Sequence, residues 1–241
     1  MPLSALAPIP LLIVAALALM QPGRRPGALP RLAEYAALAA LALVTAGAVQ
    51  VAMHGPSDVF SGTGALALGL SADPVTAVMA LLVGFVGWIV VRYSRTYLDG
   101  EAREGAFHGL MLATVAAVLV LVQAATLAVL VGAFVAIGLA MKRLLLFYAE
   151  RAEARRAATK FALVWGAGDV ALVAASALLW NAYGTAEIGA ILAEAGAGLP
   201  LAAQVATGLL VLTALLKTAA FPLHGWLTEV MEAPTPVSAL L

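Results

Sequence analysis

Residues 208–224 read GLLVLTALLKTAAFPLH, an apolar run that contains one charge and one proline. Placing the charge of Lys217 in lipid costs about 2.5–3.5 kcal/mol, so such a lysine is expected to face protein or water. Pro222, five residues later, lacks a backbone N–H and clashes with the carbonyl of Thr218, which predicts a broken helix. A charge beside a broken helix at membrane depth is typical of membrane proteins that move ions.

The composition around this stretch predicts an all-α integral membrane protein. Of the 241 residues, 63% are hydrophobic and 11% are charged, whereas soluble domains carry about 25% charged residues. The chain has no cysteine, which excludes iron–sulfur clusters and thiolate metal sites, and its three histidines lack ligand spacing. The net charge is zero, so nothing indicates nucleic acid. We therefore expect no cofactor, and no redox or hydrolytic chemistry within this chain.

Segments long enough to cross a bilayer need about 20 apolar residues. Gly105 to Met141 holds no Asp, Glu, Lys or Arg over 37 residues, which is too long for one span, so we expect a tight turn near Gln123–Thr126. The prediction is about seven transmembrane helices, the last broken at Pro222. The expected spans are Leu3–Met20, Leu32–Met53, Pro74–Val91, Gly105–Gln123, Thr126–Met141, Phe161–Trp180 and Leu199–Leu216.

Basic residues alternate between the expected loops. The first, third and fifth loops hold 12 of the 13 Lys and Arg residues, and Lys217 is the exception. The positive-inside rule makes that side cytoplasmic and places the N-terminus outside, in a multi-pass protein of a bacterial-type inner membrane. In the sixth loop, Ala186–Ala195 is expected to form a short interfacial helix.

Two motifs resemble one family. The run KTAAFPLHGWL (residues 217–227), followed by MEAPTPVSALL (residues 231–241), resembles the antiporter-like, proton-translocating membrane subunits of complex I, Mrp antiporters and Dab inorganic-carbon transporters. The resemblance implies a 14-helix fold, of which this chain would be an N-terminal fragment ending at the start of helix 8. It divides the chain into residues 1–72, two helices and an extracytoplasmic loop, and residues 73–241, the first part of the antiporter-like domain. Its motif residues are Pro222, Glu232, Pro234 and Pro236, with Thr235 expected to cap the helix after it.

The resemblance also implies a proton pathway. In the family, the lysine matching Lys217 is thought to exchange protons while pairing with and leaving an acidic partner. The family's glutamate would fall at Phe134, and no acid lies between Glu104 and Glu150. Asp169 remains as the acid deep inside the spans, so it, the next span, or a changed mechanism must account for Lys217.

Simpler readings exist for the same residues. Lys217 could snorkel to the interface, and Asp169 could serve as a structural hydrogen-bonding group. His224, which follows the expected break, is a candidate relay or capping group. Glu232 is tied to the motif and could fix the loop before an eighth span.

Two details favour a Dab-type subunit: Ala233, where complex I members usually have glycine, and the run KRLLLFY (residues 142–148). The resemblance then implies proton flow that drives bicarbonate or CO₂ capture, with a soluble, carbonic-anhydrase-like zinc protein as partner beside other subunits and the lipid bilayer. The alternatives are an NADH-quinone oxidoreductase large membrane subunit, an Mrp-type cation/proton antiporter, or a non-conducting structural anchor.

Overall fold

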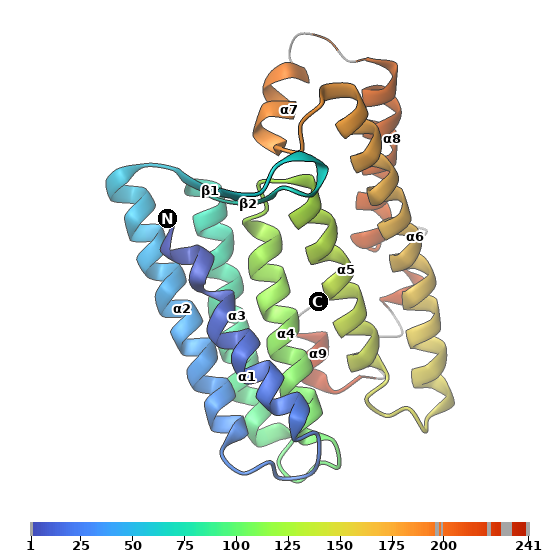
Figure 1. Cartoon of the computed structure of the whole chain (residues 1–241). Helices are drawn as coiled ribbons and strands as arrows, with labels where there is room; N and C mark the ends of the chain where they lie inside the picture. Colours follow the sequence, from blue (N-terminus) through green and yellow to red (C-terminus); the bar gives the residue numbers. More distant parts are fainter. Residues whose placement is uncertain (1, 196–197, 199, 221–222, 228–232, 240–241) are drawn as a thin grey trace.

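The computed structural model describes residues 2–195, 198, 200–220, 223–227 and 233–239. Long helices run roughly side by side, and a small hairpin lies across one end of them (Figure 1). The elements are η1 (Leu3–Leu6), α1 (Pro8–Met20), α2 (Leu29–His54), β1 (Ser57–Ser61), η2 (Gly64–Leu66), β2 (Leu68–Ala72), α3 (Pro74–Tyr97), α4 (Glu104–Val122), α5 (Leu127–Leu145), α6 (Ala152–Tyr183), α7 (Ile188–Ala195), α8 (Leu201–Lys217), η3 (Leu223–Trp226) and α9 (Thr235–Ser238).

Among the described residues, six helices are long and apolar enough to cross a membrane, and α8 is a shorter apolar helix of 17 residues. The predicted helical membrane fold is therefore confirmed. The turn near Gln123–Thr126 is also present, since α4 ends at Val122 and α5 begins at Leu127. The expected span Phe161–Trp180 is the apolar part of a longer helix, because α6 already begins at Ala152.

The helices α1 to α4 form a tightly packed group around α4. A side chain at Gly105 would lie only 1.9 Å from the carbonyl oxygen of Gln21, so glycine lets α4 touch the end of α1. Gly109 approaches the Ala15 carbonyl in the same way. Small residues at such contacts let helix backbones approach closely. The resulting van der Waals packing holds membrane helices together, because the hydrophobic effect does not drive their association in lipid. This group supplies a wall against which α5 packs.

A β-hairpin follows α2 and was not predicted. Strands β1 and β2 pair antiparallel, from Ser57 opposite Ala72 to Ser61 opposite Leu68. The Ser71 amide donates to the Gln123 carbonyl at 2.8 Å, and the Ala125 amide donates to the Gly69 carbonyl at 2.9 Å. The hairpin therefore supplies hydrogen-bond partners for backbone groups of the α4–α5 turn, which would otherwise need water or another partner.

The helix α7 lies beside the same turn. The Leu127 amide donates to Ala186, and the Ile188 amide donates to Ala125, each at 2.9 Å. A helix was predicted over Ala186–Ala195, and the structure has it from Ile188 because the residues before it pair with the turn.

The loops α1–α2, α3–α4 and α5–α6 lie together at the end of the bundle opposite the hairpin (Figure 1). These loops and the adjoining helix ends carry the 12 basic residues other than Lys217. We call this the basic end. Two of its arginines, Arg92 and Arg95, make salt bridges with Glu34.

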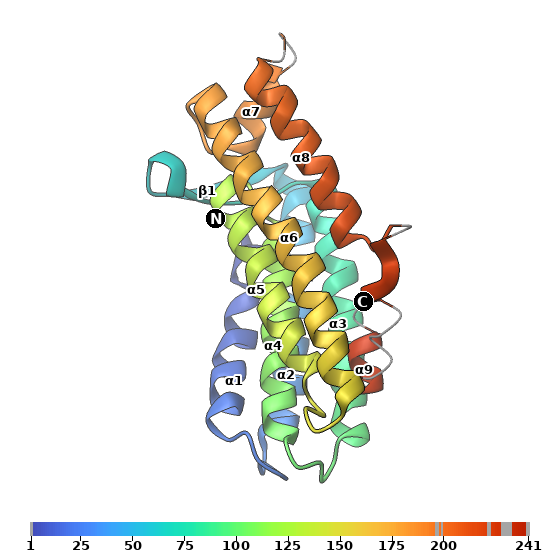
Figure 2. The same ribbon diagram turned by 90° about the vertical axis from the view of Figure 1, so that its right-hand side faces the viewer.

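The C-terminal part begins where α8 ends at Lys217. Figure 2 shows α8 running alongside α6. Ala219 follows with φ of 51°, a left-handed conformation that is costly for a residue with a side chain. The predicted cap at Thr235 is wrong, because Pro234 occupies the N-cap of α9 and the Thr235 hydroxyl is 3.1 Å from the Tyr97 hydroxyl. Pro222 and Glu232 lie outside the described residues.

Candidate functional site

An ion pair joins the two C-terminal helices. The Lys217 Nζ lies 2.6 Å from Asp169 Oδ1, with the lysine at the end of α8 and the aspartate in the middle of α6. The Lys217 side chain is 4% exposed and the Asp169 side chain is 19% exposed. Lys217 therefore does not snorkel to the surface, and the two charges balance each other at the interface of α6 and α8.

The stem of the lysine side chain runs along α6 at Gly168. A Cβ at Gly168 would lie 3.4 Å from Cε of Lys217 and 3.6 Å from Cβ of Leu216, which are ordinary van der Waals distances, so the lysine stem and α8 pack directly against α6 here. The Thr213 hydroxyl, one turn before Lys217, lies 3.3 Å from the Gly168 carbonyl and 2.9 Å from the Leu209 carbonyl, and either oxygen can accept its hydrogen bond. These contacts fix where the lysine leaves α8.

Two aromatic rings face the lysine ammonium. The Nζ lies 4.0 Å from the centre of the Trp165 ring and 4.6 Å from that of Phe134, within the range of cation–π attraction. Phe134 is the position at which the family resemblance places a glutamate. The ammonium therefore has one carboxylate and two ring faces around it, and a ring face attracts the charge but cannot accept the proton.

The Trp165 ring is held in place from α5. A Cβ at Gly138 would lie 2.5 Å from the indole, so Gly138 lets the ring lie directly on the α5 backbone. The indole Nε1 donates to the Phe134 carbonyl at 3.2 Å. Phe161 stacks on the indole with ring centres 5.1 Å apart, and Trp226 meets it edge-on at 6.0 Å.

Two cavities adjoin the pair from different sides. One, of about 430 Å³, is lined by Lys217 together with residues of α4, α5 and the turn after α8; we call it the lysine cavity. The other, of about 180 Å³, lies between α5 and α6 and is lined by Asp169 and, towards the basic end, by Lys142; we call it the α5–α6 groove. Trp165 lines both.

The remaining predicted residues lie apart from this pair or outside the described part. His224 is exposed in η3 and is not among the residues that line the lysine cavity, whereas its neighbour Trp226 is. Pro234 and Pro236, both in the second motif, are buried at the N-cap and in the first turn of α9.

Two further buried groups were missed from the sequence. Glu104 is 2% exposed, and its Oε2 accepts hydrogen bonds from the amides of Arg25 and Gly100, each at 3.1 Å. His108 is fully buried one turn into α4, and its ring nitrogens find no hydrogen-bond partner in the described part of the chain. Glu104 lies at a helix end and His108 in an apolar run, so neither stood out by its pattern.

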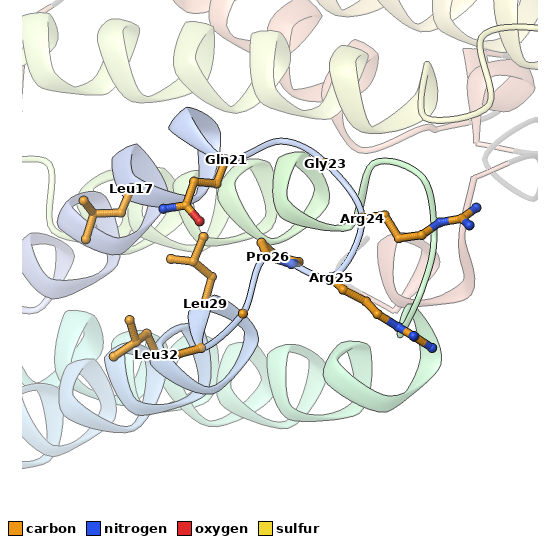
Figure 3. A pocket seen from close by; sticks show the side chains of 10 residues that line it. Leu17, Gln21, Gly23, Arg24, Arg25, Pro26, Leu29 and Leu32 are labelled. Carbon is orange, nitrogen blue, oxygen red and sulfur yellow. The ribbon is translucent and has the colours of Figure 1, made fainter.

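A larger cavity lies at the basic end and is separate from the pair. It measures about 590 Å³ and is bounded by the α1–α2 loop and the adjoining helix ends. Its Arg24 and Arg25 side chains extend away from Leu17, Leu29 and Leu32 (Figure 3). The residues described contain no group of three or more His, Cys, Asp or Glu side chains that could hold a metal ion.

Comparison with known families agrees with this architecture. A family model described as "NADH:quinone oxidoreductase/Mrp antiporter, TM" matches residues 124–241, which include Phe134, Asp169 and Lys217. A second, described as the N-terminus of complex I chain 5, matches residues 60–108. The chain belongs to the antiporter-like superfamily of membrane subunits.

Individual antiporter-like relatives include Dab proteins. A probable inorganic carbon transporter subunit, DabB2 of Halothiobacillus neapolitanus, is 41% identical over 78% of this chain and 35% of its own length. The DabB of Hydrogenovibrio crunogenus is 37% identical over 71% of this chain and 34% of its own length. NADH-quinone oxidoreductase subunit L of Mycobacterium tuberculosis is 33% identical over 72% of this chain and 27% of its own length. The chain thus spans about a third of the length of these relatives.

Solved structures show the same fold. A chain of the Mrp complex from Dietzia matches with a TM-score of 0.79 and 28% identity, over 98% of this chain and 26% of that one. A chain of an archaeal membrane-bound sulfane sulfur reductase matches with a TM-score of 0.87 at 19% identity, over 99% of this chain and 49% of that one, which shows the fold alone. Both belong to complexes of several subunits. The chain is a multi-pass membrane protein.

Proposed function

We propose that this chain forms part of a proton-conducting membrane subunit in which Lys217 and Asp169 carry the proton. The observation that supports this proposal is the 2.6 Å ion pair between two helices inside an apolar span. Keeping two charges at that depth is costly, and membrane proteins retain such groups mainly on ion or proton pathways. The relation to Mrp and complex I subunits supports the same function.

The proposed cycle uses the flexibility of the lysine side chain. While Asp169 is ionised and in contact, it stabilises the protonated ammonium. If the carboxylate is protonated or moves away, the ammonium keeps only the ring faces of Trp165 and Phe134, which favour its charge more weakly. Water in the lysine cavity can then accept a proton from Lys217. In this proposal Asp169 takes the place of the family's glutamate, and His224 is a relay further along the chain.

We further propose that proton flow serves the capture of bicarbonate or CO₂, with a soluble zinc protein as partner. The Dab relatives, which are named as probable inorganic carbon transporter subunits, support this assignment. The positive-inside rule supports a cytoplasmic basic end, an extracytoplasmic N-terminus and a bacterial inner membrane. Zinc would belong to the partner and not to this chain.

The proposal is tested by Lys217→Ala in membranes that contain the protein with its partner subunits. We expect uptake of labelled inorganic carbon to fall to background, while the amount of assembled protein is unchanged. Arg143→Ala is a matched control, because it removes an exposed positive charge at the basic end and should leave uptake intact. Unchanged uptake in Lys217→Ala would remove this residue from the mechanism and favour the structural anchor.

A second candidate function is cation/proton antiport, which the similarity to a chain of the Mrp complex supports. The two functions differ in what they require. Antiport predicts that a sodium gradient drives pH changes in vesicles through Lys217, without inorganic carbon. Carbon capture predicts uptake that depends on Lys217 and on the soluble partner.

A further inference from the structure

We propose that the α5–α6 groove is a water-filled route by which protons reach Asp169 from the basic end, and that Trp165 separates this route from the lysine cavity. The inference rests on the proposed function, because it assigns a pathway to the same ion pair. The route runs along the face of α5 that carries Val135, Leu139 and Lys142.

The groove has the right position and size. It is lined by Lys142, Ala162, Gly166 and Asp169, so it begins near the end of α5 and ends at the ion pair. Val135 and Lys142 mark its length, and seven residues of helix rise by about 10 Å. A volume of about 180 Å³ is large enough for several water molecules.

Small residues keep the groove open. A Cβ at Gly166 would meet nothing within 4 Å, so the space beside this residue is unfilled. A long side chain at this position would occupy the groove. The exposed fractions of the two side chains agree with a groove that opens onto Asp169, since Asp169 is 19% exposed and Lys217 is 4% exposed. The carboxylate is therefore the member of the pair that the groove reaches.

Trp165 and α5 form the wall between the two spaces. Phe134, Ile137 and Met141 of α5 line the lysine cavity, whereas Val135, Gly138 and Leu139 line the groove. The indole lines both spaces and is pinned by its hydrogen bond to the Phe134 carbonyl. A proton arriving through the groove must consequently pass through the Asp169–Lys217 contact to reach the lysine cavity.

The groove can be tested by thiol labelling, because the chain has no cysteine of its own. Gly166→Cys and Ala162→Cys should react with a charged methanethiosulfonate reagent applied from the basic end. Leu163→Cys is the matched control: Leu163 lies on α6 between them, is 69% exposed and does not line the groove. Apolar surroundings raise the pKa of a thiol, so a cysteine that faces lipid forms little thiolate and should stay unmodified.

Labelling is independent of transport, so it separates the groove from the proposed function. Reaction at positions 162 and 166 but not 163 supports the groove even if Lys217→Ala keeps its activity. Equal reactivity at all three positions, or none at 162 and 166, overturns it.

The route is tested by filling it. Gly166→Leu should reduce proton uptake into vesicles that contain the protein and abolish labelling of Val135→Cys, because Val135 lines the groove beyond position 166 for a reagent that enters from the basic end. Gly208→Leu is the control, because Gly208 also lies in a helix with nothing within 4 Å of its Cβ position but lines neither cavity. Full uptake in Gly166→Leu, with Val135→Cys no longer labelled, would show that protons do not use the groove.

The separation is tested at Trp165. Trp165→Ala should join the two spaces and let protons leak into vesicles without inorganic carbon, whereas Trp165→Phe keeps a ring in the wall and should leak less. Leak of equal size in both variants, or in neither, contradicts the role of the indole as a partition.

Discussion

The base of α4 and the middle of α6 each hold a carboxylate away from bulk water, but they stabilise it differently. Glu104 accepts two hydrogen bonds from backbone amides of the loops around it. Asp169 instead faces the flexible side chain of Lys217. Backbone donors are fixed by the fold and carry no removable charge. A lysine can move away or lose its proton. The charge that faces Asp169 can therefore change during transport, whereas the hydrogen bonds to Glu104 stay fixed.

The position of each carboxylate agrees with this difference. Glu104 begins α4 at the basic end and ties together the loops that contain Arg25 and Gly100. Asp169 lies among apolar residues of α6 and adjoins a groove. The comparison predicts that changes at Asp169 affect transport first, and that changes at Glu104 affect stability first.

The largest effect is expected for Asp169→Asn. The substitution leaves the Lys217 ammonium buried without its counter-charge, and breaking a buried ion pair costs about 3–5 kcal/mol. We expect loss of transport together with a lower amount of folded protein, measured by uptake assays and by thermal unfolding in detergent.

The double variant Asp169→Asn with Lys217→Met sharpens this prediction. Removing both charges should restore much of the stability, since no unpaired charge remains, but it should not restore transport. A double variant that transports normally would show that the pair has only a structural role.

The next effect concerns Phe134, whose ring lies 4.6 Å from the lysine ammonium. Phe134→Glu places a second carboxylate beside Lys217. Combined with Asp169→Asn, it should recover part of the lost transport, because a nearby negative charge again stabilises the ammonium. Phe134→Gln in the same background is the control that lacks the charge, and equal transport in the two would contradict electrostatic compensation.

A smaller effect is expected at the base of α4. Glu104→Gln replaces two charge-assisted hydrogen bonds by neutral ones and should lower the free energy of unfolding by about 1.5–3 kcal/mol. Transport per folded molecule should stay unchanged. The measurements are thermal unfolding and uptake normalised to protein amount, and a selective loss of uptake would remove the distinction between the two regions.

The smallest effect concerns Tyr148 in the loop after α5. Burial raises the pKa of Tyr148, and the nearby Glu101 carboxylate, 3.4 Å from its hydroxyl, raises that pKa further. Because the folded protein holds this proton more tightly, it loses stability as pH rises from the ordinary value of about 10 through the raised pKa. Glu101→Gln should lower the pKa of Tyr148 without abolishing the shift due to burial. Tyrosinate absorbance, corrected with Tyr148→Phe, measures it, and an unchanged pKa would exclude the charge of Glu101 as a cause.

The sequence predicted the parts of the site that differ most from their surroundings. Lys217 and Asp169 are charges in apolar runs, so each is visible without a structure, and their proximity was one of three explanations left open. Phe134 and Trp165 could not be recognised as neighbours of the lysine, because an aromatic residue in an apolar helix resembles ordinary packing. The lining of the groove depends on which faces of α5 and α6 meet.

The fold was predictable to the same extent. The long apolar runs predicted the helices. The alternation of basic and non-basic loops predicted that the α1–α2, α3–α4 and α5–α6 loops lie at the same end of the bundle. The hairpin was missed because its strands, SDVFS and LGLSA, are short and rich in small residues, and because it pairs with the distant turn at Gln123–Ala125. Such pairing is a property of the folded chain and not of either segment alone.

That turn has a mechanical consequence. Its backbone forms hydrogen bonds to the hairpin on one side and to the residues before α7 on the other. The part of the chain up to α4 and the part from α6 onward are therefore joined here by main-chain hydrogen bonds. Side-chain substitutions leave such main-chain hydrogen bonds largely intact. If α6 and α8 tilt when the lysine and aspartate separate, the end with the hairpin acts as the pivot, and the greatest displacement occurs at the basic end.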